Sequence, residues 1–370
     1  MTNRMQPKRI LVLGMGDLGV RIAQRVVEGG FSSTCLLAGK SEAATQWARL
    51  LSISSGREVS AARVDGQDAE ALTELLTRFE PELIVQCATL LSPFALRTVP
   101  TESAQAVLRG GFALQLAAQL PVVRTLMQAL RELGMECPVI NCSYPDATHP
   151  ILAADHPTDK DPSARTPAEG LAPTIGIGNV AIMAMWYQRN LPGANEATLK
   201  VIGQHAQLGS CLAGRFAAPE TPTPLVYLNG RRMAPEQLLF DAGLQGGAAM
   251  NHLAASTIVP ILRGFTESDG VVETHAPGVF GLRGGYPVRF VGGALELRLP
   301  EGLSLEEAVS FNDLAAKGEG IESIAEDGTV FYTEHARQSV AEFCPELAEP
   351  LRPQDVEKRF RVLERVAQAR

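Results

Sequence analysis

The sequence predicts an α/β protein, with a doubly wound parallel sheet followed by a second domain of mixed α+β structure. Three observations lead to this prediction. A glycine motif at residues 14–19 joins an apolar strand to an amphipathic helix. Short apolar runs then alternate with helical periodicity over the first 142 residues, a pattern typical of parallel sheets covered by helices. Beyond residue 170, tight-turn dipeptides between short apolar runs indicate hairpins instead.

The first domain contains five predicted strands, each with the apolar composition of a buried parallel strand. They cover residues 9–14, 33–39, 59–64, 83–87 and 139–142. The helices between them are predicted at residues 17–29, 41–51, 68–79 and 102–133, the last interrupted at Gly110 and Gly111 and at Pro121. We expect a nucleotide-binding domain at residues 1–145 and a substrate and dimerisation domain at residues 146–370, whose C-terminal helix can pack back on the first.

The second domain begins with residues 155–170, whose Asp, Pro and small polar residues predict a loop, either on the surface or crossing between the domains. Its remaining elements are mixed. Hairpins with Asn-Gly, Gly-Gly and Asp-Gly turns are predicted at residues 226–233, 288–297 and 321–333. Helices are predicted at about residues 178–190, 250–263, 304–316 and 353–369.

Composition excludes several classes of protein. The formal charge of -8 over 370 residues disfavours binding to nucleic acid or to anionic membranes. No apolar run is long enough to span a bilayer, and the N-terminus lacks a signal-type apolar region, so we expect a cytoplasmic protein. The six scattered cysteines indicate reduced thiols, and no Cys or His spacing typical of a metal site occurs.

The glycine motif predicts a dinucleotide site. Gly14 permits the tight turn after the strand, Gly16 lets a pyrophosphate approach the backbone, and Gly19 lets the helix pack closely on the sheet. The start of the helix, with Asp17 and Leu18, offers unpaired N–H groups to the phosphates. The alternative is a glycine-rich turn without a ligand. With its strand and helix, the motif favours a Rossmann domain that binds NAD or NADP.

The end of the second predicted strand favours NADP, although NAD stays possible. An NAD site has an acidic residue there for the ribose hydroxyls, whereas this chain has Gly39, Lys40 and Ser41. A cation and a hydroxyl suit a 2′-phosphate. The alternative is a solvent-facing lysine before a helix-capping serine.

Three further positions are predicted to line the cofactor because they follow strands of the sheet. Asp65 follows the third strand, where it meets the adenine or caps the next helix. Ala88 and Thr89 follow the fourth strand.

Four segments of the first domain together resemble the NADP-binding domain of saccharopine-dehydrogenase-like oxidoreductases. They are GMGDLGVRIAQRV, LLAGKSEAATQWARLL, AARVDGQDAEALTELL and ELIVQCATLLSPF, within about the first 95 residues. The resemblance implies a Rossmann domain and hydride transfer, often to or from the carbon of an amine, imine or carbonyl. Lys40 departs from the family, which usually has Arg there.

The second half does not clearly resemble that family's substrate domain. Residues 141–146 and 201–205 are instead faintly similar to segments of lactate/malate-type dehydrogenases, and this serves as a second analogy.

Three residues are candidates for catalytic roles. His205 follows an apolar strand and suits a proton carrier near neutral pH, with His275 as second choice. Asn141 follows the fifth strand, with Ser143 and Tyr144 close behind, and would orient the reacting group. Arg283, in a glycine-rich loop, would bind a substrate carboxylate. The alternatives are a structural histidine, a turn-forming asparagine and a solvated arginine.

Two other segments are interpreted as structural. The acidic residues of 312–329 are assigned to a solvated face, and the Met and aromatic cluster at 183–187 to the core. The turn at residues 176–179 either contacts a ligand or only begins a helix.

These observations predict a cytoplasmic, homodimeric NADP-dependent oxidoreductase acting on a small carbonyl, imine or amine substrate that carries a carboxylate. Two other functions stay open. A lyase or synthase that recycles its dinucleotide would retain the cofactor and show no net change in nicotinamide absorbance. A non-catalytic NAD(P)-binding regulator would tolerate replacement of His205, Asn141 and Arg283.

Overall fold

The computed structural model describes residues 6–154, 174–216, 221–244 and 247–369. The loop predicted at residues 155–170 lies outside the described residues.

One six-stranded parallel sheet dominates the first half of the chain, with the strand order β3-β2-β1-β4-β5-β6. This is the order of a Rossmann fold, so the predicted fold class is confirmed. The strands span β1 (Lys8–Leu13), β2 (Ser32–Gly39), β3 (Val59–Arg63), β4 (Leu83–Gln86), β5 (Val139–Asn141) and β6 (Thr174–Gly176). The sequence did not predict β6. It lies beyond residue 145, so the sheet extends past the predicted domain boundary.

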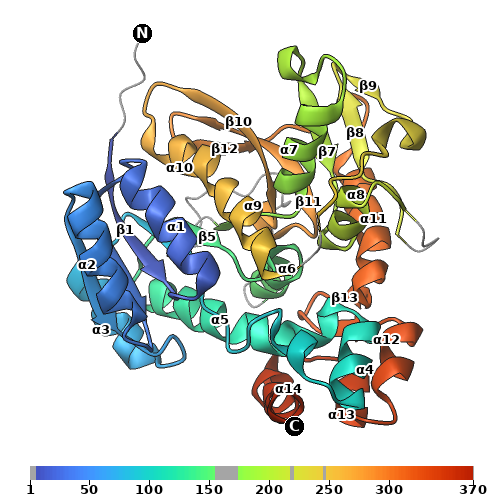
Figure 1. Cartoon of the computed structure of the whole chain (residues 1–370), viewed down its shortest axis with the longest axis horizontal. Coiled ribbons are helices and arrows are strands. Elements are labelled where there is room, and N and C mark those ends of the chain that lie inside the picture. The colour runs from blue at the N-terminus through green and yellow to red at the C-terminus, as the bar shows by residue number, and fades with distance from the viewer. Residues whose placement is uncertain (1–5, 155–173, 217–220, 245–246, 370) are drawn as a thin grey trace.

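Helices pack on both faces of this sheet (Figure 1). Side chains alternate along β1, so Ile10 and Val12 share a core with α1 and α2, whereas Leu11 and Leu13 share a core with α3 and α5. The helices span α1 (Asp17–Glu28), α2 (Ala43–Ser55), α3 (Ala69–Phe79), α4 (Glu102–Gly110) and α5 (Leu116–Glu132).

The long helical stretch breaks at the glycine pair but not at the proline. Gly111 has φ 105°, a conformation that favours glycine, and it separates α4 from the short 3₁₀ helix η2 (Phe112–Gln115). Helix α5 runs through Pro121, where an interruption was predicted. Burial of the neighbouring Leu120 and Val122 outweighs the backbone hydrogen bond that the proline lacks.

Two antiparallel three-stranded sheets form much of the second half, in the orders β7-β8-β9 and β10-β11-β12. A bridge between Gly203 and Gly285 joins them. The hairpins predicted at 226–233 and 288–297 are confirmed. The strands span β7 (Leu199–Ile202), β8 (Leu225–Leu228), β9 (Arg231–Arg232), β10 (Val271–Pro277), β11 (Gly285–Val291) and β12 (Ala294–Leu297).

Five helices accompany these sheets. They span α6 (Pro145–Ala154), α7 (Val180–Asn190), α8 (Leu208–Leu212), α9 (Asn251–Ser256) and α10 (Ile258–Thr266). The single helix predicted at 250–263 is therefore two helices. Both pack on α1 and so attach the second half to the Rossmann sheet.

The C-terminal segment returns to the first half of the chain. Helix α12 packs on α4, and α14 packs on α5 (Figure 1). Leu363 and Val366 of α14 lie in the same core as Leu126 of α5. The elements span α11 (Leu305–Ala316), β13 (Ile321–Ile324), β14 (Val330–Tyr332), α12 (Glu334–Val340), α13 (Pro345–Ala348) and α14 (Val356–Gln368). Strands β13 and β14 form the third predicted hairpin.

Across the described ranges, no single helix has both the length and the apolar character needed to cross a bilayer. The segments Glu102–Gly110 and Phe112–Glu132, bent by 117°, meet the length and composition criteria only as a pair.

Candidate functional site

A cavity of about 420 Å³ lies at the carboxyl ends of the parallel strands. Leu18 at the start of α1 and Cys142 after β5 line one part of it, and His205 and Glu319 line another. Ligands of doubly wound sheets bind at this edge. The cavity therefore brings the glycine motif and the first-choice histidine to one place.

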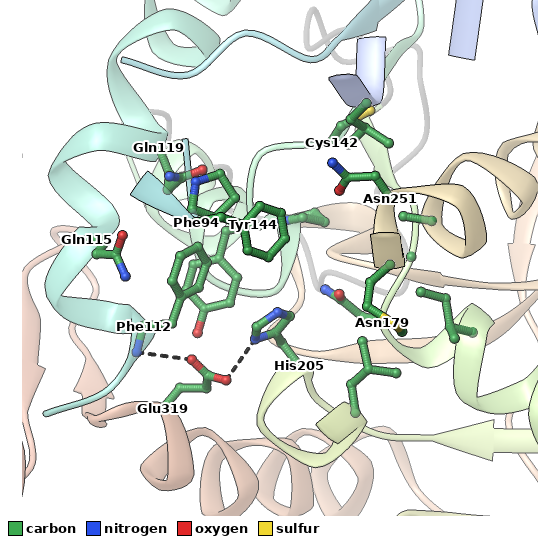
Figure 2. Close-up of a pocket in the computed structure, with 18 of the residues that line it drawn as sticks. Phe94, Phe112, Gln115, Gln119, Cys142, Tyr144, Asn179, His205, Asn251 and Glu319 are labelled. Carbon is green, nitrogen blue, oxygen red and sulfur yellow. Dashed lines mark hydrogen bonds and ion pairs between the residues drawn. The ribbon is translucent and has the colours of Figure 1, made fainter. Parts of the chain in front are cut away.

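His205 is held by Glu319, which belongs to the 3₁₀ helix η10 (Lys317–Glu319). Its Nδ1 lies 2.8 Å from Oε1 of Glu319, and Oε2 of the same carboxylate accepts a hydrogen bond from the backbone N–H of Phe112 at 3.2 Å (Figure 2). The His205 side chain is 30% exposed, and Nε2 has no partner among the described residues. One imidazole nitrogen is therefore fixed and the other is available to a ligand.

The charges around His205 favour its protonated form. Burial by itself would lower the pKa of His205, but the charges of Glu319 and Asp146 and the hydrogen bond to Glu319 outweigh it, so the pKa is raised. An imidazolium close to neutral pH is suited to donate a proton.

Asp146 fixes the backbone of this site. Its Oδ1 accepts the backbone N–H of His205 at 3.0 Å, and its Oδ2 accepts a hydrogen bond from the side chain of Asn179. Burial raises the pKa of Asp146 to about 6, although the nearby His205 and the Asn179 hydrogen bond oppose that shift. Asn179, from the turn at 176–179, lines the cavity, so that turn contacts the candidate site.

Two aromatic rings enclose the imidazole. The ring centroids of Phe112 and Tyr144 lie 5.3 and 5.2 Å from that of His205, and 4.8 Å from each other. Apolar rings around a charged pair reduce its exposure to water and so strengthen its electrostatic interactions.

Two residues with strained backbone conformations line the cavity. Tyr144 and Asn179, neither of them glycine, both have φ 46°, and both line the cavity. Such conformations cost about 1–3 kcal/mol each and persist where the surrounding structure enforces them, often at functional sites.

The glycine turn next to Leu18, which lines the cavity, has the shape of a pyrophosphate-binding turn. A Cβ on Gly14, which has φ 99°, would lie 2.4 Å from the backbone nitrogen of Ala88, and one on Gly19 would lie 1.8 Å from the carbonyl oxygen of Gly14. A Cβ on Gly16 would meet nothing within 4 Å. No side chain caps α1, so its first N–H groups face this open space. The geometry shows a tight turn at Gly14 and a close approach at Gly19, and the open space at Gly16 leaves its pyrophosphate contact a prediction.

Asp17 is the one acidic group at this turn. It pairs with Arg21 at 3.0 Å and accepts a hydrogen bond from Asn251 at 2.9 Å, and the hydrogen bond from Arg21 is the main cause of its lowered pKa. Arg21 thus offsets a charge that would repel phosphate.

The predicted NADP residues Lys40 and Asp65 contact each other. Nζ of Lys40 lies 2.9 Å from Oδ2 of Asp65, and both side chains are exposed. Burial would raise the pKa of Asp65, but hydrogen bonds from Lys40 and Gln67 outweigh it and lower the pKa. Lys40 is thus partly neutralised by an acid at the same edge. Gly39 ends β2 beside it, and the hydroxyl of Ser41 accepts the backbone N–H of Ala43 at 3.4 Å.

The ends of β4 and β5 meet beside the cavity. The Sγ atoms of Cys87 and Cys142 lie 3.5 Å apart, and Cys142 lines the cavity. All six cysteines are free thiols. Thr89, predicted to contact the cofactor, donates its hydroxyl to the carbonyl of Leu91 at 3.0 Å.

Asn141 is placed differently from the prediction. It is fully buried at the end of β5 and does not line the cavity. Its Nδ2 donates to Oγ1 of Thr148 at 3.1 Å, and its Oδ1 accepts the backbone N–H of Ser143 at 3.0 Å. Both ends of the amide are used within the turn, so the geometry gives Asn141 a structural role.

Arg283 also lies away from the cavity. Its guanidinium forms an ion pair with Asp313, with Nη2 2.6 Å from Oδ2. The cation is thus already neutralised. Arg97, in the 3₁₀ helix η1 (Ala95–Thr98), lines the cavity instead, with its guanidinium carbon 5.5 Å from the ring centroid of Phe94. It forms no ion pair with any described residue.

The other buried histidines are structural. Nε2 of His275 accepts the backbone N–H of Val201 at 2.9 Å, and burial lowers its pKa to about 3. His149 bonds the carbonyl of Gly278, and its pKa is lowered by burial to about 4. Both stay neutral, so His275 is unsuited to the proton-carrying role of second choice.

Sequence reasoning missed Glu319 and Arg97. The segment 312–329 was assigned to a solvated face, but the Glu319 side chain is only 13% exposed and contacts His205. Its flanking Gly318 and Gly320 were the available signal, since a turn with little side-chain bulk lets a carboxylate approach another element closely. Within the described ranges, no three His, Cys, Asp or Glu side chains are grouped as a metal site would require.

No model of a known protein family matches the sequence, and no curated protein does. Among solved structures, the malate dehydrogenase of Picrophilus torridus aligns over 85% of this chain and 98% of its own, with a TM-score of 0.50 and 12% identity. A lactate dehydrogenase of Eimeria maxima, solved with NADH and oxamate, aligns over 86% of this chain and 92% of its own, with a TM-score of 0.49 and 12% identity.

The likeness to the malate dehydrogenase, together with the strand order, shows the fold. The resemblance to saccharopine-dehydrogenase-like proteins is not confirmed by these comparisons and stays a prediction. The chain has the Rossmann-type α/β fold of the dehydrogenases it is similar to.

Proposed function

We propose that this protein is an NAD(P)-dependent oxidoreductase acting on a carbonyl, imine or amine carbon of a small substrate. The observation that carries the proposal is that Leu18, within the glycine motif, and His205 line the same cavity. A dinucleotide on the glycine turn and a proton carrier at Nε2 of His205 would therefore meet one substrate.

The residues of the chain have distinct roles in this proposal. The turn at Gly14 and Gly16 and the start of α1 would hold the dinucleotide, which supplies or accepts a hydride when bound. In the reductive direction, His205 donates the proton from Nε2 to the substrate heteroatom. Glu319 accepts the Nδ1 hydrogen, fixes the ring and stabilises the imidazolium.

Substrate binding is assigned to other residues than those predicted first. Arg97 lines the cavity without an ionic partner among the described residues, so it would bind a substrate carboxylate. Asn179 lines the cavity and would orient the reacting group, because its amide is already fixed by Asp146. The more specific prediction, that the cofactor is NADP rather than NAD, rests on Lys40.

The first test is a titration of the protein with NADPH and NADH, followed by nicotinamide fluorescence, and then a turnover screen with keto acids in the presence and absence of amines. We expect binding, and turnover that falls about 10²- to 10⁴-fold in His205→Gln with unchanged cofactor affinity. His252→Gln, on the exposed surface of α9, is the matched control. Absence of binding to both dinucleotides would refute the proposal.

A further inference from the structure

A second cavity, of about 300 Å³, lies on the other side of α7 from the candidate active site. Asn179, which precedes α7, and Ile182 of α7 line the first cavity. Three other residues of α7, Ala181, Ala184 and Met185, line the second. The two sets of lining residues do not overlap. The second cavity is therefore a separate space that the proposed reaction does not use.

Two cations line this second cavity, Lys200 of β7 and Arg298, which follows β12. Nζ of Lys200 donates to the carbonyl of Leu299 at 2.8 Å, and neither cation forms an ion pair with a described residue. Burial and then the charge of Arg298 lower the pKa of Lys200, against the opposing charges of Glu273 and Glu301. The two cations thus lie close enough to repel each other.

Arg298 has a buried hydrogen-bond donor without an acceptor in the described part of the chain. Its Nε is buried and has no hydrogen-bond partner among the described residues. A buried, unsatisfied donor on a charged group is costly, and native structures usually pair such a group with protein, water or an ion. Solvent does not reach this Nε, so a ligand in the cavity would meet the guanidinium through its other nitrogens, which form no hydrogen bond with a described residue.

The remaining charged groups leave the cavity positive. Glu273 is the one acidic residue in the lining, and its side chain is exposed on β10. His275 also lines the cavity, but burial lowers its pKa to about 3, so it is neutral. The hydroxyls of Thr198 and Thr274 add potential donors. The lining therefore favours an anion, in a chain whose net charge is -8.

Apolar side chains form the rest of the wall. Met185 is 39% exposed, although it is a large hydrophobic side chain, and Val288 and Pro287 also line the cavity. Small-molecule sites typically combine an apolar wall with a few polar groups, in volumes of about 300–1,000 Å³. A compact apolar body attached to an oxyanion fits this combination.

We propose that the second cavity binds a small oxyanion, a carboxylate or phosphate group, between Lys200 and Arg298, with any apolar part of the ligand against Met185. The site is distinct from the proposed substrate and dinucleotide sites, so it can be tested without either ligand.

The experiment is calorimetric titration of the full chain with sodium phosphate and with sodium benzoate, each against sodium chloride at matched ionic strength and pH. We expect one of the two oxyanions to bind more tightly than chloride. Tighter phosphate binding identifies a phosphate ligand, and tighter benzoate binding identifies a carboxylate on an apolar body.

Four variants locate the site. Arg298→Gln and Lys200→Gln should each weaken binding at least tenfold, about 1.4 kcal/mol. Arg232→Gln makes the same charge change on the exposed strand β9 and should leave binding unchanged. Arg97→Gln removes the carboxylate site proposed in the first cavity, so oxyanion binding that persists in Arg97→Gln and falls in Arg298→Gln belongs to the second cavity. Circular dichroism and NADPH affinity, expected to match the parent protein, confirm that the first three variants are folded.

The proposal is overturned if neither oxyanion binds more tightly than chloride. It is equally overturned if Arg232→Gln or Arg97→Gln weakens binding as much as Arg298→Gln does. Because no dinucleotide is present in the titration, failure here is distinguishable from failure of the proposed oxidoreductase function.

Discussion

Nδ1 of His205 lies 2.8 Å from Oε1 of Glu319, although 114 residues separate them in the chain. The carboxylate also accepts the backbone N–H of Phe112, so one side chain joins three segments around the cavity. Its charge raises the pKa of His205 against the effect of burial.

Glu319→Gln should therefore move the pH dependence of turnover. The loss of the negative charge lowers the pKa of His205, so the protonated imidazole is lost at a lower pH. In the reductive direction, the fall in kcat/KM on the alkaline side should begin at a lower pH than in the parent protein. Stopped-flow or steady-state assays over pH 5–9 measure this.

Glu322→Gln is the matched control, because Glu322 lies three residues on and pairs with the exposed Lys317 rather than with His205. Its pH profile should equal that of the parent. A profile for Glu319→Gln that falls in amplitude without moving would show that Glu319 has only a structural role.

Substitutions at two glycines of the same turn should affect dinucleotide binding and protein stability separately. Gly16→Ala should fold normally, because its Cβ meets no atom within 4 Å, yet it should lose dinucleotide affinity, because the methyl group fills the space proposed for the pyrophosphate. Gly14→Ala should instead lower the free energy of unfolding by about 2–4 kcal/mol, since its Cβ would overlap Ala88 at a positive φ. Thermal unfolding and NADPH titration of both variants test this contrast. Equal stability of the two would contradict it.

The Lys40–Asp65 pair should control the choice between NADPH and NADH. Asp65→Asn removes the carboxylate that neutralises Lys40, so NADPH should bind more tightly, whereas Lys40→Asp should abolish the preference for NADPH. A tenfold change, about 1.4 kcal/mol, is the scale to expect. Fluorescence titration measures both affinities.

Glu70→Gln, on the exposed first turn of α3, makes the same charge change as Asp65→Asn and should leave both affinities unchanged. Unaltered NADPH binding in Lys40→Asp would show that Lys40 does not contact the 2′-phosphate.

The C-terminal helix should contribute to the stability of the Rossmann core. Leu363 of α14 is fully buried in the core that it shares with α5, so Leu363→Ala should cost about 2–5 kcal/mol of unfolding free energy. Urea denaturation measures the loss. Glu364→Ala, on the exposed side of the same helix, should be close to neutral. An equally small effect of both would mean that α14 is dispensable for the core.

The sequence was sufficient for most of the Rossmann sheet, because strands such as β1 and β4 contain continuous buried apolar runs and helical periodicity lies between the strands. Strand β6 was missed because its last residue, Gly176, was assigned to the glycine turn at residues 176–179. The turn at Gly14 was predictable because its positive φ is a property of the local backbone, whereas the close approach of Ala88 to the same glycine depends on the tertiary fold.

The pair of residues in the proposed proton-carrying site was only half predictable. His205 follows its own strand, a local signal, whereas Glu319 reaches it through tertiary packing that no local pattern records. Arg283 and Asn141 were assigned by residue type at a strand end or in a glycine loop. Both find partners instead, Asp313 and Thr148, because a buried or half-buried polar group must be satisfied by whatever lies closest.

The packing of α14 on α5 also sets an order of events during synthesis. Residues 116–132 are synthesised long before residues 356–368. The apolar face of α5 that packs on α14 is therefore uncovered while the intervening chain is made. Contacts this distant in sequence slow folding, and an uncovered apolar face invites aggregation in the meantime. Helix α14 can therefore complete the core on this face of the Rossmann sheet only after the residues between α5 and α14 have been made.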